Sequence, residues 1–140
     1  MMKQIIVKFV IPLAVICFSV VTMRTTAFVD DIGSVGFTGF PFLYTCKGFH
    51  TSMSDQFFLI PLFIDFIVYL LFWLVIFLFL KKITDLNKAP MFLSGILIIL
   101  ATLVFTMNIL LASSRDNMFM LKRDFEIKVT HRSLYIVPWF

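Results

Sequence analysis

The chain has 140 residues, a formal net charge of +4, and a composition that is 61% hydrophobic and only 14% charged. Soluble domains have about 45–50% apolar and about 25% charged residues. A chain this short cannot bury so many apolar side chains, because its surface is large relative to its volume. These proportions exclude a soluble enzyme, a disordered chain and a disulfide scaffold, and we expect an integral membrane protein whose first partner is the lipid bilayer.

Three apolar stretches have the length of about 20 residues that a helix needs to cross a bilayer. They are residues 5–23, 57–80 and 91–112. Backbone groups in lipid must be hydrogen-bonded within their own segment, so we expect three helices. The first stretch has the basic start and apolar middle of a cleaved signal peptide, but Arg24 follows it directly, and we favour a retained anchor.

The basic residues lie in small groups beside the apolar runs, where they can contact lipid headgroups, and no basic face with interleaved aromatic residues indicates nucleic-acid binding. Orientation is set mainly by lysine and arginine in short loops near helix ends. The densest short cluster is the link 81–90, with Lys81, Lys82 and Lys88, and Lys3 precedes the first run. We therefore expect a bacterial inner-membrane protein with a cytoplasmic N-terminus and an extracytoplasmic C-terminus.

This topology divides the chain into an anchor (1–23), an extracytoplasmic loop (24–56), a second helix (57–80), a cytoplasmic link (81–90), a third helix (91–112) and an extracytoplasmic tail (113–140). The predicted fold class is an all-α membrane protein of three helices, with an irregular or small β cap formed by the loop and the tail. Glycines in the loop favour turns. Alternating residues over 124–130 indicate a strand, and residues 134–137 indicate a second one. A tail that lies on the membrane without a fixed sheet remains the alternative.

The candidate polar site within the membrane consists of Asp65, Tyr69, Thr106 and Asn108. Counted from the start of its apolar run, Asp65 is about 12 Å deep at 1.5 Å per residue, and a carboxylate there must face protein or water. Tyr69 is four residues on and shares its helix face. Thr102, Thr106 and Asn108 of the third helix lie at a depth where they can hydrogen-bond the carboxylate. Asp65 is either a proton or cation relay or a polar residue that packs helices together. We favour packing, because a relay needs further ionisable groups.

No motif in the chain indicates catalysis, a cofactor or a metal. Phosphate loops and the serine- and zinc-hydrolase signatures are absent, and no histidine lies in an apolar run where it could bind haem. His50 and His131 lie in polar segments, and we interpret them as surface residues rather than as a metal pair. We therefore predict a protein that is not an enzyme and holds no catalytic, cofactor-binding or metal residues.

Two resemblances bear on the class of protein. Three features follow one another along the chain: an anchor helix, Gly-Phe-Pro-Phe at 39–42, and a helix that contains Leu62, Asp65 and the pair Phe72 and Trp73. This arrangement resembles a recurring type of small, uncharacterised bacterial inner-membrane protein. This resemblance covers roughly residues 5–80 and implies a topology but no activity. The segment 86–90 is similar to the cytoplasmic link of three-helix immunity proteins against pore-forming colicins.

These observations predict an accessory or self-associating membrane subunit that acts through helix contacts with a membrane-protein partner or with further copies of itself. The colicin-immunity resemblance implies an alternative, inhibition of a membrane-inserted toxin. The third hypothesis is a small transporter or proton-conducting unit that uses Asp65.

Overall fold

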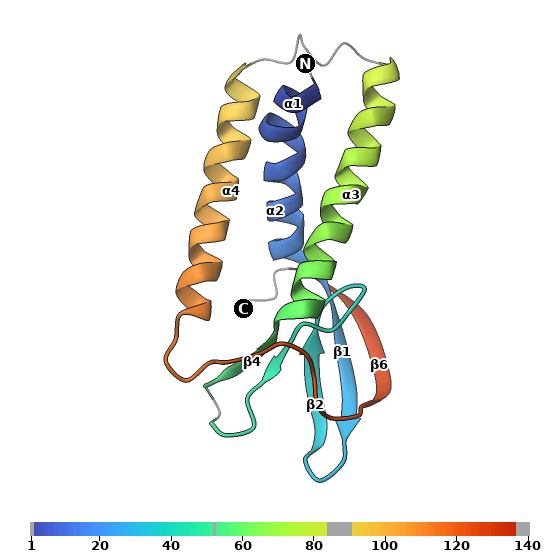
Figure 1. Ribbon diagram of the computed structural model, residues 1–140, viewed down its shortest axis with the longest axis vertical. Helices are drawn as coiled ribbons and strands as arrows, with labels where there is room; N and C mark the ends of the chain where they lie inside the picture. The colour runs from blue at the N-terminus through green and yellow to red at the C-terminus, as the bar shows by residue number, and fades with distance from the viewer. Residues whose placement is uncertain (1, 52, 84–90, 137–140) are drawn as a thin grey trace.

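A computed structural model describes residues 2–51, 53–83 and 91–136. Within these residues, three helical segments stand side by side and a sheet lies at one end of them (Figure 1). The first segment consists of α1 (Met2–Ile5), the π-helical turn η1 (Ile6–Val10) and α2 (Ile11–Val20). The other two are α3 (Leu59–Ile83) and α4 (Met91–Ala112). All three segments are long and apolar enough to cross a membrane.

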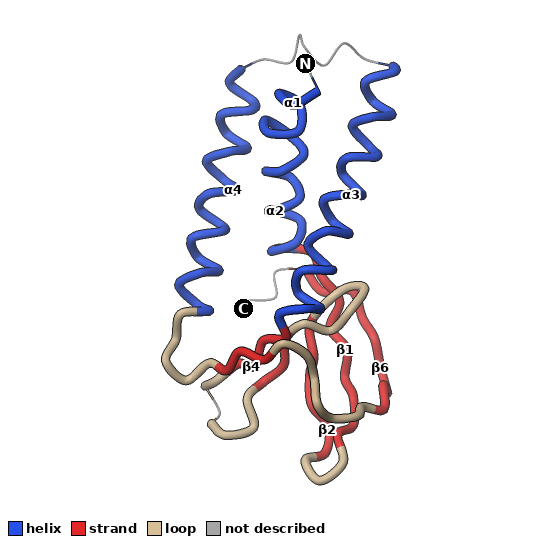
Figure 2. The backbone as a smooth tube through the Cα atoms, in the orientation of Figure 1, coloured by secondary structure: helices blue, strands red, loops and turns tan. Residues whose placement is uncertain are grey.

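The sheet contains six strands, β1 (Val21–Val29), β2 (Gly33–Thr38), β3 (Thr45–Lys47), β4 (Asp55–Phe58), β5 (Met118–Met120) and β6 (Lys128–Ile136). Their order is β5-β4-β3-β2-β1-β6, and every pair is antiparallel except β4 and β5. Figure 2 shows that helix and sheet meet without a connecting loop at two places, where α2 continues into β1 and β4 continues into α3.

The predicted all-α fold class is wrong, because the sheet is a substantial second layer rather than a small cap. The first apolar run does not stay helical to Met23. Its helix ends at Val20 and strand β1 begins at Val21. Val21 and Thr22 are β-branched residues, which fit a pleated strand better than a helix. Farther along β1, Thr25, Ala27 and Val29 are buried while Phe28 between the last two is exposed, as expected for a strand with one inner face.

The strand predicted over 124–130 is also wrong in its position. Strand β6 begins only at Lys128 and runs to Ile136. The preceding residues Phe125 and Ile127 instead pack against the hydrophobic core of the sheet, whose buried members are Ala27, Val29, Phe37, Leu43, Cys46 and Phe58. The Phe125 ring contacts the ring of Phe37 at 6.3 Å and that of Phe58 at 6.1 Å, measured between centroids. The alternation over 124–127 therefore reflects side chains that cover the core, and only residues 128–130 of the predicted strand belong to β6.

Helix α2 lies between α3 and α4 (Figure 1). On one side, Phe9 stacks on Phe77 with ring centroids 5.7 Å apart. Phe18 contacts the rings of Phe66 and Tyr69, each also at 5.7 Å. These contacts pair the start of the first segment with the end of α3, so the two run antiparallel, and the last turn of α2 lies level with the second turn of α3.

Asn117 connects the end of α4 to the sheet. Its side-chain amide donates hydrogen bonds to the carbonyl oxygens of Leu111 and Ala112, at 2.9 and 3.1 Å. Its Oδ1 accepts a 2.9 Å hydrogen bond from the backbone N–H of Asp55 in β4. The last carbonyl groups of a helix have no partner within the helix, so one asparagine satisfies two of them and fixes α4 to the neighbouring strand.

Candidate functional site at the helix–sheet junction

Asp65 is the centre of the candidate site, and it is completely buried. Its Oδ1 accepts a 2.9 Å hydrogen bond from the backbone N–H of Phe42. The residue lies level with the end of α2, where the first segment changes from helix to strand. The hydrogen bond to Oδ1 therefore comes from the segment between β2 and β3, and not from another helix, while the buried Oδ2 has no hydrogen-bond partner among the described residues.

The segment 39–44 closes over Asp65 through a tight backbone path. Gly39 has φ +147°, a conformation that side chains disfavour. A Cβ added at Gly39 would collide with the carbonyl oxygen of Phe42. Hydrogen bonds from Gly39 N–H to the Met23 oxygen and from Tyr44 N–H to the Thr38 oxygen, both 3.0 Å, hold the two ends of the segment. This path turns the N–H of Phe42 toward α3.

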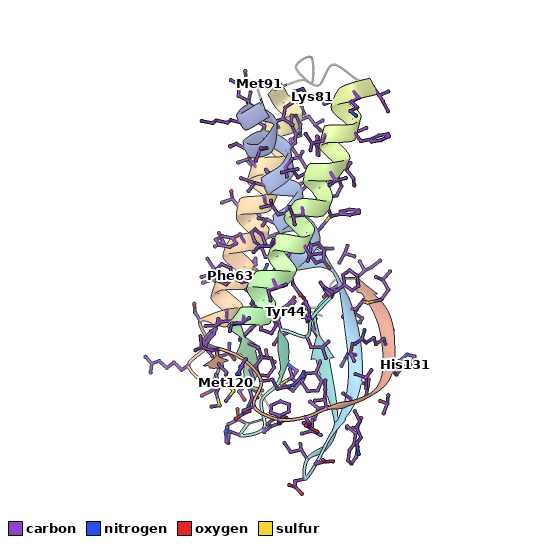
Figure 3. All side chains as sticks on the ribbon, turned by 45° about the vertical axis from the view of Figure 1, so that its right-hand side comes forward. Tyr44, Phe63, Lys81, Met91, Met120 and His131 are labelled. Carbon is purple, nitrogen blue, oxygen red and sulfur yellow. The ribbon has the colours of Figure 1, made fainter. Side chains whose placement is uncertain are left out.

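Two tyrosines lie near the carboxylate at the same junction. Tyr69 donates a 2.7 Å hydrogen bond from its hydroxyl to the carbonyl oxygen of Val21, the first residue of β1. Tyr44 is 4% exposed and stacks on Phe18 with centroids 5.3 Å apart. Burial raises the pKa of the Tyr44 phenol well above its ordinary value, so this side chain stays neutral at physiological pH. Figure 3 shows Tyr44 between the sheet and the helices.

The polar residues of α4 do not reach Asp65, so the expected contact with Thr102, Thr106 and Asn108 is wrong. Asn108 donates from Nδ2 to the Ser19 hydroxyl at 2.9 Å and to the Val104 carbonyl at 2.8 Å. Thr106 is exposed and donates only to the carbonyl of Thr102, one turn earlier in its own helix. The reason is the helix order, because α2 lies between α3 and α4 and takes the contact with Asn108.

The four predicted residues therefore form two separate arrangements. Asp65 and Tyr69 share a helix face as expected, and both bind backbone groups of the chain that flanks α3. Asn108 belongs to a contact between α2 and α4, and Thr106 belongs to neither arrangement. Sequence reasoning missed Phe42 as the partner of Asp65, because a backbone donor leaves no trace in the pattern of side chains.

Two apolar pockets flank the end of α2. One, of about 280 Å³, lies between α2, α3 and the adjoining strands and is lined by Cys17, Met23, Phe40, Trp73 and Leu134 among others. The other, of about 340 Å³, lies between α2, α3, α4 and the sheet. Its lining includes Phe63, Phe66, Phe105 and Ile109, with the Ser19 and Asn108 pair as polar members. Such linings suit hydrocarbon chains or apolar side chains rather than charged ligands.

The described residues contain no group of three or more histidine, cysteine or acidic side chains that could hold a metal ion. His131 lies on β6, while His50 follows β3, and β1 and β2 separate those strands in the sheet. Within the three described helices, Asp65 is the sole acidic residue. The arrangement at the junction can fix the helices to the sheet, but it offers no nucleophile with a neighbouring base.

No protein-family model matches the chain, and neither a curated protein nor a solved structure matches it.

Proposed function

We propose that the chain is a small, non-enzymatic integral membrane protein that acts through contacts of its helices with a partner subunit or with further copies of itself. The observation that carries this proposal is the exposure of two of its three spans. In the most apolar 18-residue stretch of α3 only 6% is buried inside the molecule, and the same holds for α4. Helix surface that the molecule itself leaves uncovered in a membrane faces lipid or other helices.

The surface best suited to such contacts is the groove between α3 and α4, which contains the pocket of about 340 Å³. The two helices flank α2 instead of closing on each other (Figure 1). Aromatic side chains line the walls, and the Ser19–Asn108 hydrogen bond lies at the floor. Polar pairs of this kind hold helices together in lipid, and this one fixes α4 to α2 at the groove.

The proposed orientation places the N-terminus in the cytoplasm of a bacterium and the sheet on the outer side of the inner membrane. Lys81 and Met91 lie at the helix ends opposite the sheet (Figure 3), and Lys3 and Lys82 occupy corresponding positions near the ends of their helices. Lysines near helix ends favour the cytoplasmic side. Lys88 lies outside the described residues. Helix α3 is about 37 Å long at 1.5 Å per residue, longer than a hydrocarbon core of about 30 Å, so its first turns can extend toward the sheet beyond the hydrocarbon.

The surroundings of Asp65 support a structural role in this proposal and not a proton relay. The carboxylate is closed off by segment 39–44, and it binds a backbone group there. The toxin-immunity hypothesis rests on residues 86–90, which lie outside the described residues, and no contact in the described structure favours it over a general accessory role.

The test uses the full chain, purified in mild detergent, with two matched variants. Ile109 lines the groove, whereas its neighbour Leu110 is 65% exposed and does not. Ile109→Trp should remove a co-purifying subunit or reduce the oligomer to a monomer, while Leu110→Trp should retain it. Light scattering after size exclusion gives the oligomeric state, and mass spectrometry identifies any partner.

Two results would contradict the proposal. A native chain that is monomeric and without a partner would remove helix contact as its function, and equal behaviour of the two variants would remove the groove as the contact surface. Alkaline phosphatase fused after Phe140 tests orientation separately, and an inactive fusion would reverse it. Release of the chain by a carbonate wash would contradict membrane integration.

A further inference from the structure

Strand β6 forms one edge of the described sheet and has a strand neighbour only on its β1 side. It is nine residues long, and every residue except Tyr135 is exposed. The opposite edge, β5, has only three residues. A long, exposed edge strand presents a row of backbone donors and acceptors on which a further strand can pair.

The part of this edge nearer the helices, residues 131–136, is regular. Residues 131–136 of β6 pair in unbroken register with residues 26–21 of β1, and the register shifts only between Thr26 and Ala27. At that shift, the Thr130 hydroxyl donates a 2.8 Å hydrogen bond to the Thr26 carbonyl. Six consecutive residues are therefore held in extended form, so an added strand meets a preformed partner and orders only itself.

The side chains along β6 select the chemistry of that partner. Strands β1 and β6 contain Arg24, Lys128, His131 and Arg132 and no acidic residue. Nearer the helices, Leu134 is 64% exposed and Ile136 is 62% exposed. Opposite charges on directly opposed residues of neighbouring strands stabilise the pair, and like charges destabilise it. Arg132, Leu134 and Ile136 lie in the regular part and share one face, because they oppose Thr25, Met23 and Val21, whereas Lys128 lies beyond the register shift and opposes Phe28. The edge therefore fits an extended segment that has an acidic residue beside Arg132, apolar residues beside Leu134 and Ile136, and a further acidic residue where it reaches Lys128.

A second copy of this chain does not fit the edge in a membrane. Strand β6 runs roughly along the helices (Figure 1), so two copies of the same orientation would bring their β6 strands together in parallel. If a twofold axis parallel to the strands related the two copies, each backbone N–H would face the same N–H of the other copy, and each C=O the same C=O. Parallel strands pair only when the N–H groups of one strand face C=O groups of the other. An antiparallel pair would invert one copy relative to the other.

We propose that β6 binds an acidic, extended segment of another protein by strand addition. The exclusion of a second copy rests on the membrane topology proposed above, whereas the charge and edge arguments stand on the sheet alone. Contacts through the helix groove and contacts through β6 use opposite parts of the molecule, so each can fail without the other.

The test measures binding of fluorescent ten-residue peptides to the full chain in nanodiscs by anisotropy. The first peptide alternates valine and threonine and carries two glutamates, the second has lysines in place of the glutamates, and the third keeps the glutamates but has prolines in place of the valines. The glutamate peptide should bind at least about tenfold more tightly than the other two. The double variant Lys128→Glu and Arg132→Glu should prefer the lysine peptide, while Lys122→Glu, an exposed change outside β6, should behave as the native chain.

Equal binding of the proline peptide would overturn the proposal, because charge attraction alone would then explain the affinity. Absence of binding by the glutamate peptide, or an unchanged preference in the double variant, would overturn it as well. Efficient disulfide formation between two copies of Ser133→Cys would show that a second copy occupies the edge. The Ile109→Trp variant should bind the glutamate peptide normally, so a failure of the groove proposal is distinguishable from a failure of this one.

Discussion

The backbone N–H of Phe42 donates a 2.9 Å hydrogen bond to Oδ1 of Asp65, and so joins the segment between β2 and β3 to the second turn of α3. The carboxylate is fully buried, so the bond has no competition from water. We expect Asp65→Ala to lower the free energy of unfolding by about 1–3 kcal/mol, because it leaves the N–H of Phe42 without an acceptor. Thermal unfolding in mild detergent, followed by circular dichroism, measures the change.

Asp65→Asn is the matched variant, because its amide oxygen can still accept that hydrogen bond. It should lose less than half the stability that Asp65→Ala loses. Asp124→Ala, at an exposed acidic position, should leave the unfolding temperature unchanged. An alanine variant as stable as the native chain would show that the bond contributes nothing to the fold.

Gly39 provides a backbone test of the same junction. Gly39→Ala should destabilise the protein by about 1–3 kcal/mol, because alanine disfavours φ +147° and its Cβ would collide with the Phe42 carbonyl. Gly95 lies in α4 with open space around it, so Gly95→Ala should be neutral or stabilising by up to about 1 kcal/mol. Similar effects of the two substitutions would contradict the proposed closure of segment 39–44.

The Ser19–Asn108 pair forms a hydrogen bond between α2 and α4. Asn108→Ala should cost about 1 kcal/mol, in the usual range for such bonds in membrane proteins. Thr106→Ala should cost less, because the Thr106 hydroxyl binds only its own helix. Unfolding in mixtures of mild detergent and dodecyl sulfate measures both variants, and a loss at Thr106 as large as at Asn108 would argue against the described helix order.

Cys46 reports on the integrity of the sheet core. Burial, with the nearby Asp55 carboxylate adding to it, raises the pKa of the Cys46 thiol to about 12. At pH 8 the thiolate is scarce in the folded chain, so in a Cys17→Ser background, which removes the other free thiol, maleimide should modify Cys46 slowly until dodecyl sulfate unfolds the protein. A cysteine placed at Met53, which is 85% exposed, should react at once and serves as the control. Rapid labelling of Cys46 in the native chain would contradict a closed core.

The same thiol sets a direction for stability against pH. An unfolded cysteine has a pKa of about 8.5, so above that pH the unfolded chain loses its proton while the folded chain retains it up to about 12. The free energy of unfolding should therefore fall as the pH rises from about 9 to 12. The buried Tyr44 phenol acts in the same direction above its ordinary pKa of about 10, so Cys46→Ala should flatten the curve between about pH 9 and 10, and an unchanged slope there would show that Cys46 does not cause it.

The sequence identifies the second and third helices closely, because long apolar runs leave few alternatives in lipid. The stretch 91–112 coincides with α4, and 57–80 overlaps most of α3. A small β cap was predicted from the loop and the tail, but the extent of the sheet was not, because its longest inner strand begins inside an apolar run. Val21 and Thr22 are as apolar or as small as residues of a span, and only their β-branching distinguishes them.

The candidate site was predicted in part. The shared face of Asp65 and Tyr69 follows from a four-residue spacing within one helix, and both residues meet at the junction. The partner of Asp65 could not be predicted, because the donor is a backbone N–H whose direction depends on the fold of 39–44. The roles of Thr106 and Asn108 depend on which of the three helices lies in the middle. The three runs are apolar on every side, so the sequence does not indicate that order.

Helix α2 ends at Val20 and strand β1 begins at the next residue, Val21, so no linker separates the helix from the sheet. The Tyr69 hydroxyl also holds the Val21 carbonyl to α3. A change of bilayer thickness tilts transmembrane helices. In this molecule a tilt of α2 would carry the sheet with it, so the thickness of the surrounding lipid would set the angle of the sheet.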